Sequence, residues 1–371
     1  MRYWLWGMLL VMSAAAGSAQ GKTVVDILNR KVVVPDTPTR IVLGESRLLY
    51  TLALVRDGDP VKNIVGWPAD MQRYDNQSWQ LYLKAFPQIS QISQLNATSY
   101  DQLNAEKIIS LKPDLVILPL YAKDRSDPSL LRGQLEKSGI PVIYVDLRVD
   151  QLHNTLPSLR LLGLVLNSQA KTQRFIDFYQ QHMQAVRQRL ASYHGPKPTV
   201  ILQLHLGRKE SCCTTVSHSN LADLLDYAGG DNIASGKFGS VYGEMNPEAV
   251  IAANPDVYIT TGMGGSDGKD KKSLRLGPGV TAQQAQDSFR RIMASQPILS
   301  SLRAVKEGRA YGVWHNFYLS PYHLVDVEVF AKALYPQLFA DLDPQQTVRE
   351  IYQRFLPIPF NGTYWDQLKP H

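Results

Sequence analysis

The stretch from Ser168 to Tyr193 constrains the fold most strongly, because it contains neither glycine nor proline. Its apolar residues recur at spacings of three and four, the period of a helix with one buried face; they are Ile176, Tyr179, Met183, Val186 and Leu190. Ser168 is a suitable N-cap, and Gly195-Pro196 stops the helix. At about 1.5 Å per residue, we predict a rod about 38 Å long near the middle of the chain.

The length and composition of the chain allow two ordinary domains. It has 371 residues, 44% of them hydrophobic, and a formal charge of +6 whose charges are interspersed without a long basic run. A mildly basic surface can attract anions or nucleic acid, but we favour a solvated face of mixed charge. No RNA-binding aromatic signature, helix-turn-helix pattern or zinc-finger spacing supports nucleic acid, so we expect no nucleic-acid partner.

The N-terminus has the pattern of a signal peptide. Arg2 precedes an apolar run over 3–12 and small residues over 13–19, which predicts a signal peptide at 1–19 with cleavage near Gly17-Ser18-Ala19. A transmembrane anchor is the alternative, but the run is too short to cross a bilayer comfortably. No cysteine follows the run, so we expect no lipid anchor. The mature protein is therefore predicted to be exported and soluble.

Cys212 and Cys213 are adjacent and are the two cysteines of the chain. A bridge between neighbours lies outside the usual geometry of disulfides, so we expect two buried thiols. A vicinal disulfide, which export permits, and joint ligation of a metal remain alternatives.

The first half alternates short apolar strands with helices. After a predicted hairpin (23–27 and 31–34), strands are expected at 39–43, 64–66, 115–118 and 142–145, and helices at 48–55, 101–111 and 130–137. This alternation predicts a parallel sheet covered by helices, with ligands at the carboxyl ends of the strands. The loops there carry Glu45-Ser46-Arg47, Trp67, Tyr121 and Asp146.

The second half repeats this pattern, with strands expected at 199–204 and 257–260 and a helix at 220–227. Asn246 caps a further helix with Pro247 at its first position. The segments Glu106 to Ile117 and Glu248 to Ile259 each contain a glutamate, an apolar helix, Pro-Asp seven residues after the glutamate, and a strand. Two similar α/β lobes on a rigid spacer leave a binding cleft between them.

These motifs resemble the periplasmic substrate-binding proteins of ABC importers, in the class whose two lobes are joined by one long helix. The matching segments are 103–117, 245–259, Gly229 to Ala234, Val313 to Pro321, Phe355 to Pro359 and Gly362 to Trp365. The resemblance implies an α/β fold of two Rossmann-like lobes, at 20–167 and 194–371, joined by a helix at 168–193. It also implies a periplasmic monomer that delivers its cargo to an inner-membrane permease.

In this family one glutamate on each lobe commonly docks against arginines of the permease, and Glu106 and Glu248 occupy those positions here. Two carboxylates on separate lobes, read by paired cations, would orient the complex. The alternative is that both are ordinary first-turn glutamates favoured by the helix dipole.

The family carries iron(III)-siderophores, haem, cobalamin or metal ions, and we expect an iron(III)-siderophore or similar chelate as the ligand, with no intrinsic cofactor. Stacking rings and guanidiniums suit such a chelate. The alternative for any single candidate is a purely structural role or simple exposure to solvent. The candidates at strand ends and in a glycine-rich loop are Arg47, Trp67, Tyr121, Arg208, Tyr242, Arg275, Trp314, His315 and Tyr318; Trp67, Arg208 and Trp314 are the preferred ones.

Direct binding of a bare metal is less favoured, because the histidines are scattered and no His-x-x-x-His occurs. His315 is nonetheless a possible ligand that completes the coordination of a chelated nickel or iron ion. A nickel or cobalt chelate, haem and cobalamin therefore remain alternative cargoes.

We expect no enzyme activity. The segment 264–269 resembles a phosphate loop, but Met263 replaces its first glycine and Asp270 replaces the hydroxyl that would hold magnesium. An enzyme acting in the same cleft is the remaining alternative from another functional class.

Overall fold

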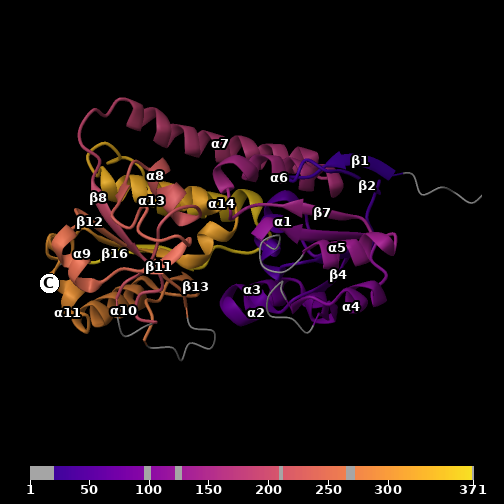
Figure 1. The fold of residues 1–371 in the computed structure, drawn as a ribbon, viewed down its shortest axis with the longest axis horizontal. Helices are drawn as coiled ribbons and strands as arrows, with labels where there is room; N and C mark the ends of the chain where they lie inside the picture. The colour runs from indigo at the N-terminus through magenta and orange to yellow at the C-terminus, as the bar shows by residue number, and fades with distance from the viewer. Residues whose placement is uncertain (1–20, 96–101, 122–127, 209–211, 265–271, 370–371) are drawn as a thin grey trace, which may run out of the picture.

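The computed structural model of the protein describes residues 21–95, 102–121, 128–208, 212–264 and 272–369 (Figure 1). The predicted signal peptide, the phosphate-loop-like segment beyond Gly264 and His371 lie outside these residues. No helix in the described part of the chain is long and apolar enough to cross a membrane.

The N-terminal lobe is built on a five-stranded sheet of order β5-β4-β3-β6-β7, in which every pairing is parallel. A hairpin of β1 and β2 precedes it, as predicted. The strands are β1 (Gly21–Val25), β2 (Lys31–Pro35), β3 (Ile41–Leu43), β4 (Ile64–Trp67), β5 (Ser93–Gln94), β6 (Leu115–Pro119) and β7 (Val142–Val145). The helices are η1 (Ser46–Leu48), α1 (Leu49–Val55), α2 (Asp70–Tyr74), α3 (Asn76–Ala85), η2 (Pro87–Gln91), α4 (Ala105–Ser110), α5 (Pro128–Lys137) and α6 (Gln151–Val165).

The central strands of this sheet are apolar throughout because both faces are covered. In β6, Leu115 and Ile117 belong to one core cluster, whereas Val116 and Leu118 belong to another on the opposite face. Successive side chains of a strand point to opposite faces, so an unbroken apolar run marks a strand buried on both sides. The second cluster includes residues of α4 and α5 and is confined to this lobe.

The C-terminal lobe contains a seven-stranded sheet of order β11-β9-β8-β12-β14-β16, with β10 paired to β8. The predicted strands β8 and β12 pair in parallel, and β14, which the sequence analysis did not predict, pairs in parallel with β12. The strands β9, β11 and β16 add antiparallel edges. The strands are β8 (Thr199–Gln203), β9 (Thr214–Val216), β10 (Asp231–Asn232), β11 (Tyr242–Glu244), β12 (Val257–Gly262), β14 (Ala310–Trp314) and β16 (Trp365–Gln367), with β13 (Gly277–Pro278) and β15 (Gly362–Thr363) forming a separate pair.

Helices cover the C-terminal sheet and complete the lobe (Figure 1). They are α8 (Leu221–Tyr227), α9 (Pro247–Ala253), α10 (Ala282–Ala294), α11 (Pro297–Ser301), α12 (Arg303–Lys306), η5 (His315–Leu319), α13 (His323–Leu334) and α14 (Pro344–Phe355).

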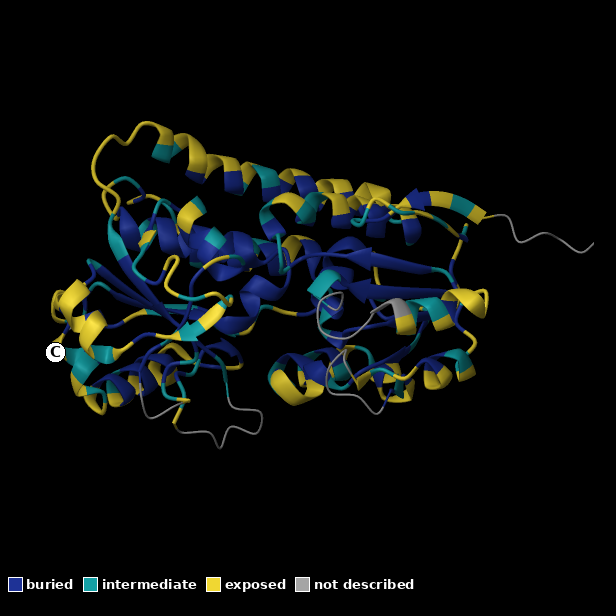
Figure 2. Cartoon of the chain, viewed as in Figure 1, coloured by how far each residue is buried: buried dark blue, intermediate teal, exposed yellow. Residues whose placement is uncertain are grey.

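The long helix α7 (Gln169–Ala191) is present, and its 23 residues give it a length of about 34 Å. It packs on α1 and α6 of the first lobe and on α13 of the second. The predicted stripe is confirmed at Ile176, Tyr179, Met183 and Val186, all buried, and Tyr179 contacts the ring of His323 with a hydroxyl-to-Nε2 distance of 2.7 Å. Figure 2 shows the buried face of α7 turned toward the lobes and the exposed face turned outward.

The internal repeat seen in the sequence corresponds to a repeated hydrogen-bonded clamp. Asp114 Oδ2 accepts from the backbone N and the hydroxyl of Thr39 at 2.7 and 2.8 Å. Asp256 Oδ2 accepts from the same two groups of Thr199, each at 2.9 Å. In each lobe the Pro-Asp segment therefore ties the start of one sheet strand to that of a parallel strand.

The lobes also meet through aromatic residues below the cleft. Tyr50 of α1 lies edge-on to Trp314, with ring centroids 5.9 Å apart, and its carbonyl accepts from the hydroxyl of Tyr322 at 3.4 Å. The larger core cluster accordingly contains residues from both lobes.

The prediction of two free thiols was wrong, because Cys212 and Cys213 form a disulfide. The peptide bond between them is cis and their Cα atoms lie 3.1 Å apart, so the spacing expected of ordinary disulfides did not apply. Both side chains are buried, as predicted.

Candidate functional site

The loop after the parallel strand β7 of the N-terminal lobe is joined by hydrogen bonds to the loop between β9 and α8 of the C-terminal lobe. The amide of Asn220 donates to the carbonyl of Arg148 at 3.1 Å, and the Ser219 hydroxyl donates to the carbonyl of Val149 at 3.0 Å. A cavity of about 160 Å³ lies here, and residues of both lobes line it: Tyr121, Arg148, Val149, Ser219, Asn220, Val241 and Tyr242. The cavity therefore sits in the interlobe cleft that the sequence predicted.

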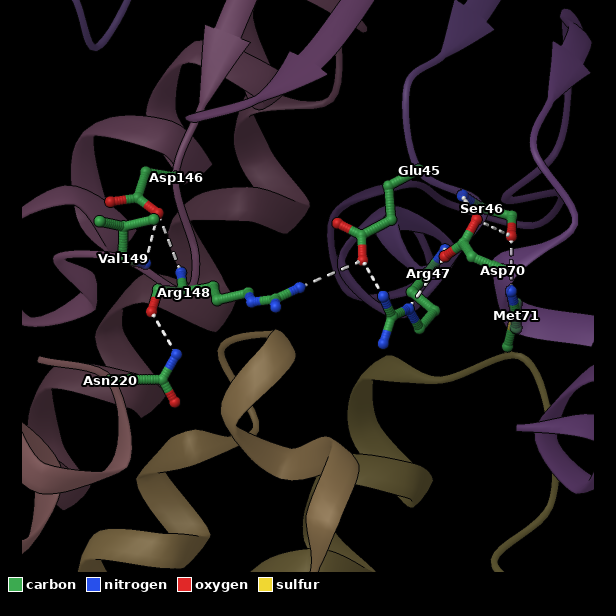
Figure 3. Close-up of polar contacts among 9 residues, drawn as sticks. All are labelled: Glu45, Ser46, Arg47, Asp70, Met71, Asp146, Arg148, Val149 and Asn220. Carbon is green, nitrogen blue, oxygen red and sulfur yellow. Dashed lines mark hydrogen bonds and ion pairs between the residues drawn. The ribbon is translucent and has the colours of Figure 1, made fainter. Parts of the chain in front are cut away.

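Two guanidiniums from different loops of the N-terminal lobe converge on one carboxylate in this cleft (Figure 3). Glu45 Oε1 lies 2.8 Å from Nη2 of Arg47, just after β3, and 3.9 Å from Nη1 of Arg148, just after β7. The three side chains are only 8%, 13% and 17% exposed, respectively. Charges so far removed from water interact more strongly than surface pairs do.

Two buried aspartates hold these loops in place. Asp70, at the start of α2, accepts from the backbone N and hydroxyl of Ser46 at 2.8 and 2.7 Å, and from Nε of Arg47 at 2.9 Å. Asp146, directly after β7, accepts from the backbone N of Arg148 at 3.0 Å and from that of Val149 at 2.8 Å. Each arginine is thus positioned by a carboxylate that is itself hydrogen-bonded to the backbone.

The carboxyl group of Glu45 is subject to opposing electrostatic effects. Burial raises its pKa above the ordinary value and Asp70 raises it further, whereas Arg47, Arg148 and a hydrogen bond with the side chain of Tyr121 oppose the shift. Oε1 contacts the two arginines but has no hydrogen bond of good geometry.

The C-terminal lobe contributes uncharged rings to the cleft. His205 and His315 stack with ring centroids 3.7 Å apart, and His315 Nδ1 lies 3.0 Å from the hydroxyl of Thr261. Tyr318 lies edge-on to His315, and the guanidinium of Arg148 lies over both Tyr121 and Tyr318, 4.3 and 5.7 Å from their centroids. Tyr121 belongs to the same lobe as Arg148, whereas the cation–π contact with Tyr318 connects the N-terminal lobe to the C-terminal lobe.

The two imidazoles are kept neutral. Burial, followed by the charge of Arg208, lowers the pKa of His205 from 6.5 to about 4. Burial, His205 and the arginines of the cleft lower the pKa of His315 well below its ordinary value. Neutral imidazoles have a free lone pair and can accept hydrogen bonds or coordinate a metal.

The structure brings together several of the predicted ligand residues: Arg47, Tyr121, Tyr242, His315 and Tyr318 surround the cleft. Arg208 is exposed and lies close enough to lower the pKa of both imidazoles. Arg275 is half-buried and bonds through its backbone to the hydroxyl of Ser288, and it does not line the cavity.

The preferred tryptophans pack inside the lobes instead of lining the cleft. Trp67 is fully buried and lies edge-on to Trp79, with centroids 5.8 Å apart. Trp314 is 2% exposed and packs against Tyr50, Phe317 and Tyr364. Neither offers a free ring face for stacking on a ligand in this conformation.

Sequence reasoning did not select Arg148, His205, Glu45 or Asp70 as site residues. Arg148 follows the carboxyl end of β7 by three positions, the same kind of place that pointed to Arg47. For the stacking of His205 and His315 there was no sequence signal, because the pair forms between different strand ends.

The predicted docking glutamates occupy equivalent places in the two lobes. Glu106 lies in the first turn of α4, capped by Asn104, and Glu248 lies in the first turn of α9, capped by Asn246. Both are exposed, and neither forms an ion pair with another described residue. The helices lie toward opposite ends of the molecule (Figure 1).

Two further findings concern alternative sites. Within the described ranges no group of three or more histidine, cysteine, aspartate or glutamate side chains is arranged to hold a metal ion. A larger cavity of about 570 Å³ lies at the outer end of the C-terminal lobe, beside Tyr193, Arg309 and Tyr335, and none of the predicted ligand residues lines it.

Comparison with known proteins shows which family this chain resembles in sequence. A family model described as periplasmic binding protein matches residues 41–313. The molybdate-binding protein MolA of Haemophilus influenzae is 23% identical over 373 residues, which cover 93% of this chain and 94% of MolA. A vitamin B12-binding protein of Yersinia pestis is 26% identical over 168 residues, covering 45% of this chain and 55% of that protein.

A solved structure agrees over nearly the whole chain. The TroA-like periplasmic binding protein FepB of Veillonella parvula superimposes with a TM-score of 0.86 at 25% identity, covering 94% of this chain and 99% of FepB. This agreement covers both lobes and the helix between them. The chain therefore belongs to the periplasmic binding protein family, whose members are the substrate-binding components of ABC transporters and work with an inner-membrane permease.

Proposed function

We propose that this protein captures an iron(III)-siderophore, or a similar anionic metal chelate, between its lobes and delivers it to the permease of an ABC importer. The observation that carries the proposal is the pair of largely buried guanidiniums, Arg47 and Arg148, which face the neutral rings of His315 and Tyr318 across the cleft. Guanidiniums bind the carboxylate or catecholate oxygens of a chelate, and aromatic rings cover its apolar edges.

A metal oxyanion such as molybdate is the second candidate. The cleft cavity of about 160 Å³ suits a small ion, whereas pockets for larger ligands usually have about 300–1,000 Å³. The full-length relative MolA is named for binding molybdate. A siderophore would instead require the lobes to part before it enters. Nickel and cobalt chelates, haem and cobalamin are further outcomes of the same test.

Cargo binding can be tested by isothermal titration calorimetry of the mature protein. The probes are ferric catecholate, ferric hydroxamate and ferric citrate complexes, molybdate, nickel-histidine, haemin and cyanocobalamin. Calorimetry is preferable to tryptophan fluorescence because Trp67 and Trp314 are buried. We expect saturable binding of one ferric chelate class and none of its iron-free form. Binding of molybdate alone would replace the chelate by the oxyanion, and binding of cyanocobalamin or haemin alone would overturn both anion proposals.

The protein is proposed to act as a monomer and to make or break no bond in its cargo. Light scattering should therefore give one chain per particle with and without the probe. Recovery of the bound probe unchanged after long incubation would agree with a carrier, and a protein-dependent chemical change of the probe would revive the enzyme alternative.

Glu106 and Glu248 are proposed to contact cationic residues of the permease. Reversing both charges, in Glu106→Lys with Glu248→Lys, should abolish uptake in cells while leaving calorimetric affinity within about twofold, because exposed charges far from the cleft are screened. Glu307, also exposed in the C-terminal lobe, provides the matched control, and Glu307→Lys should leave uptake unchanged. Normal uptake with the double reversal would exclude these glutamates from docking.

A further inference from the structure

We propose that Glu45 is an internal anion that occupies the anion-binding position between Arg47 and Arg148, so that a cargo must displace it and multiply charged anions are selected over singly charged ones. This inference rests on the proposed function, because it concerns how the same cleft chooses its cargo.

The position of Glu45 is that of a bound ligand. One oxygen, Oε1, contacts guanidinium nitrogens of two arginines from separate loops, at 2.8 and 3.9 Å (Figure 3). Convergence of two guanidiniums on one carboxylate oxygen is how proteins also recognise carboxylate and oxyanion ligands. Here the protein itself supplies that carboxylate.

The two arginines differ in what they lose if Glu45 moves away. Arg47 retains Asp70, whose Oδ2 lies 2.9 Å from its Nε. For Arg148, Glu45 is the one carboxylate within 4.0 Å among the residues that the structure describes. Arg148 also lines the cleft cavity. Displacement of Glu45 would therefore leave one largely buried cation without a carboxylate partner at the edge of a space of about 160 Å³.

The contacts of Glu45 make its displacement feasible. Its Oε1 is close to Arg47, and Tyr121 interacts with the carboxyl group, but Oε1 is buried without a hydrogen bond of good geometry and its distance to Arg148 is long for an ion pair. A buried carboxylate with incomplete partners keeps much of its desolvation cost. An entering anion that makes shorter contacts with Arg148 would exchange a poor interaction for a better one.

Because Glu45 is covalently part of the chain, its competition with a cargo discriminates between anions of different charge. A side chain fixed beside its partners competes at a high effective concentration. A singly charged anion would only replace one negative charge by another, and it would lose translational and rotational entropy on binding. A doubly charged anion adds attraction to both arginines, so it gains from the exchange. Glu45 should accordingly weaken all anions and discriminate most strongly against monoanions.

Molybdate and perrhenate provide a matched pair of probes, because both are tetrahedral oxyanions and they differ by one charge. Their affinities should be measured by calorimetry on the wild-type protein and on Glu45→Gln. We expect the wild-type protein to favour molybdate, and Glu45→Gln to bind perrhenate about tenfold or more tightly than the wild type does, since it removes one charge-to-charge competition. The ratio of molybdate affinity to perrhenate affinity should therefore be smaller in Glu45→Gln than in the wild-type protein.

Glu136 supplies the matched control. It too bridges two arginines, Arg30 at 2.9 Å and Arg132 at 3.6 Å, but it lies on α5 and is 42% exposed. Glu136→Gln should leave both affinities unchanged. If Glu45→Gln binds both oxyanions no better than the wild type, or more weakly, Glu45 is a structural anchor and the inference fails.

A measurement on the wild-type protein covers the case in which Glu45→Gln does not fold. Perrhenate keeps its single charge at all working pH values, and its affinity should rise as the pH falls from 8 to 5, because protonated Glu45 no longer competes. Burial raises the pKa of Glu45. The groups that face Glu45 or its arginines are Arg47, Arg148, Asp70, Tyr121, Tyr242, Tyr318 and His315, and His205 stacks on His315.

The two imidazoles do not confuse this readout, because the pKa of His205 is lowered to about 4 and that of His315 well below its ordinary value. Both remain neutral in the chosen range. A perrhenate affinity that does not change with pH would contradict the inference. Failure of both oxyanions to bind while a ferric chelate binds would overturn the role of Glu45 and leave the proposed function standing, whereas a protein that binds no anion or chelate fails both.

Discussion

The two lobes contribute different chemistry to the same cleft. The N-terminal lobe provides Arg47 and Arg148, held by the buried carboxylates of Asp70 and Asp146. The C-terminal lobe provides rings that are neutral at neutral pH, among them the stacked imidazoles of His205 and His315. One lobe is thus suited to select charge and the other to select shape.

This difference also predicts where each lobe is vulnerable. Charged groups buried in a network lose stability when one partner is removed, because the remaining charge stays buried and unpaired. Stacked neutral rings depend on packing and on remaining uncharged. Substitutions in the two lobes should therefore fail in different ways, and the following measurements test that contrast.

The largest effect is expected in the charged lobe, for Asp70→Asn. This change leaves Arg47 without one of its two buried counter-charges and should lower the free energy of unfolding by about 3–5 kcal/mol. Urea denaturation followed by circular dichroism measures the loss. Asp57→Asn, at a surface pair with Arg174, is the control and should stay within about 1 kcal/mol of the wild type. Equal losses of stability in the two variants would show that the buried charge network contributes no more than a surface ion pair.

Cargo affinity should separate Arg148 from Arg208. For the anion that binds in the calorimetric panel, Arg148→Gln should weaken binding by about 10- to 100-fold, since charged hydrogen bonds contribute about 1.5–3 kcal/mol. Arg208 is exposed, so Arg208→Gln should have a smaller effect that disappears in high salt. Equal salt sensitivity of the two variants would contradict the assignment of charge selection to the N-terminal lobe.

Acid should weaken the aromatic lobe through its imidazoles. The pKa of His205 is about 4 in the folded protein and 6.5 as its ordinary value, so the unfolded chain takes up the proton first. The stability that depends on neutral His205 is complete above pH 6.5 and is lost as the pH falls toward about 4.

His205→Gln removes this contribution. Between pH 8 and pH 5 the variant should lose about 2 kcal/mol less stability than the wild type, because each pKa unit corresponds to about 1.4 kcal/mol. Urea denaturation at both pH values gives the comparison. His153, exposed and paired with Asp150, offers a control position, and His153→Gln should not reduce the acid sensitivity in this way. Parallel pH profiles for the wild type and His205→Gln would contradict the assignment.

The repeated units of the fold were predictable because each has a local cause. The apolar runs of β6 and β7, the proline and asparagine that start α9, and the uninterrupted stripe of α7 are all encoded within a few residues. The antiparallel edges β9, β11 and β16 were not anticipated, since short strands with mixed burial lack a clear period.

The site was predicted less well because position at a strand end does not fix the direction of a side chain. Trp67 and Arg47 were both selected as ligand residues because they lie at strand ends. In the structure Trp67 points into the core and Arg47 into the cleft. A large apolar ring gains more from burial than from waiting for a ligand, whereas a guanidinium needs a carboxylate partner. The sequence placed Glu45 beside Arg47 but could not show that Arg148 would reach it.

The core that crosses from one lobe to the other has a consequence for folding. Only the outer face of the N-terminal sheet, beneath α4 and α5, has a separate cluster among the described residues; the remaining buried apolar residues form one cluster that runs through Tyr50, α7 and α13. Cutting the chain between the lobes would leave large apolar surfaces in water. The molecule has the outline of two bodies, but thermodynamically it should behave as a single cooperative unit, whose lobes gain or lose their native packing together.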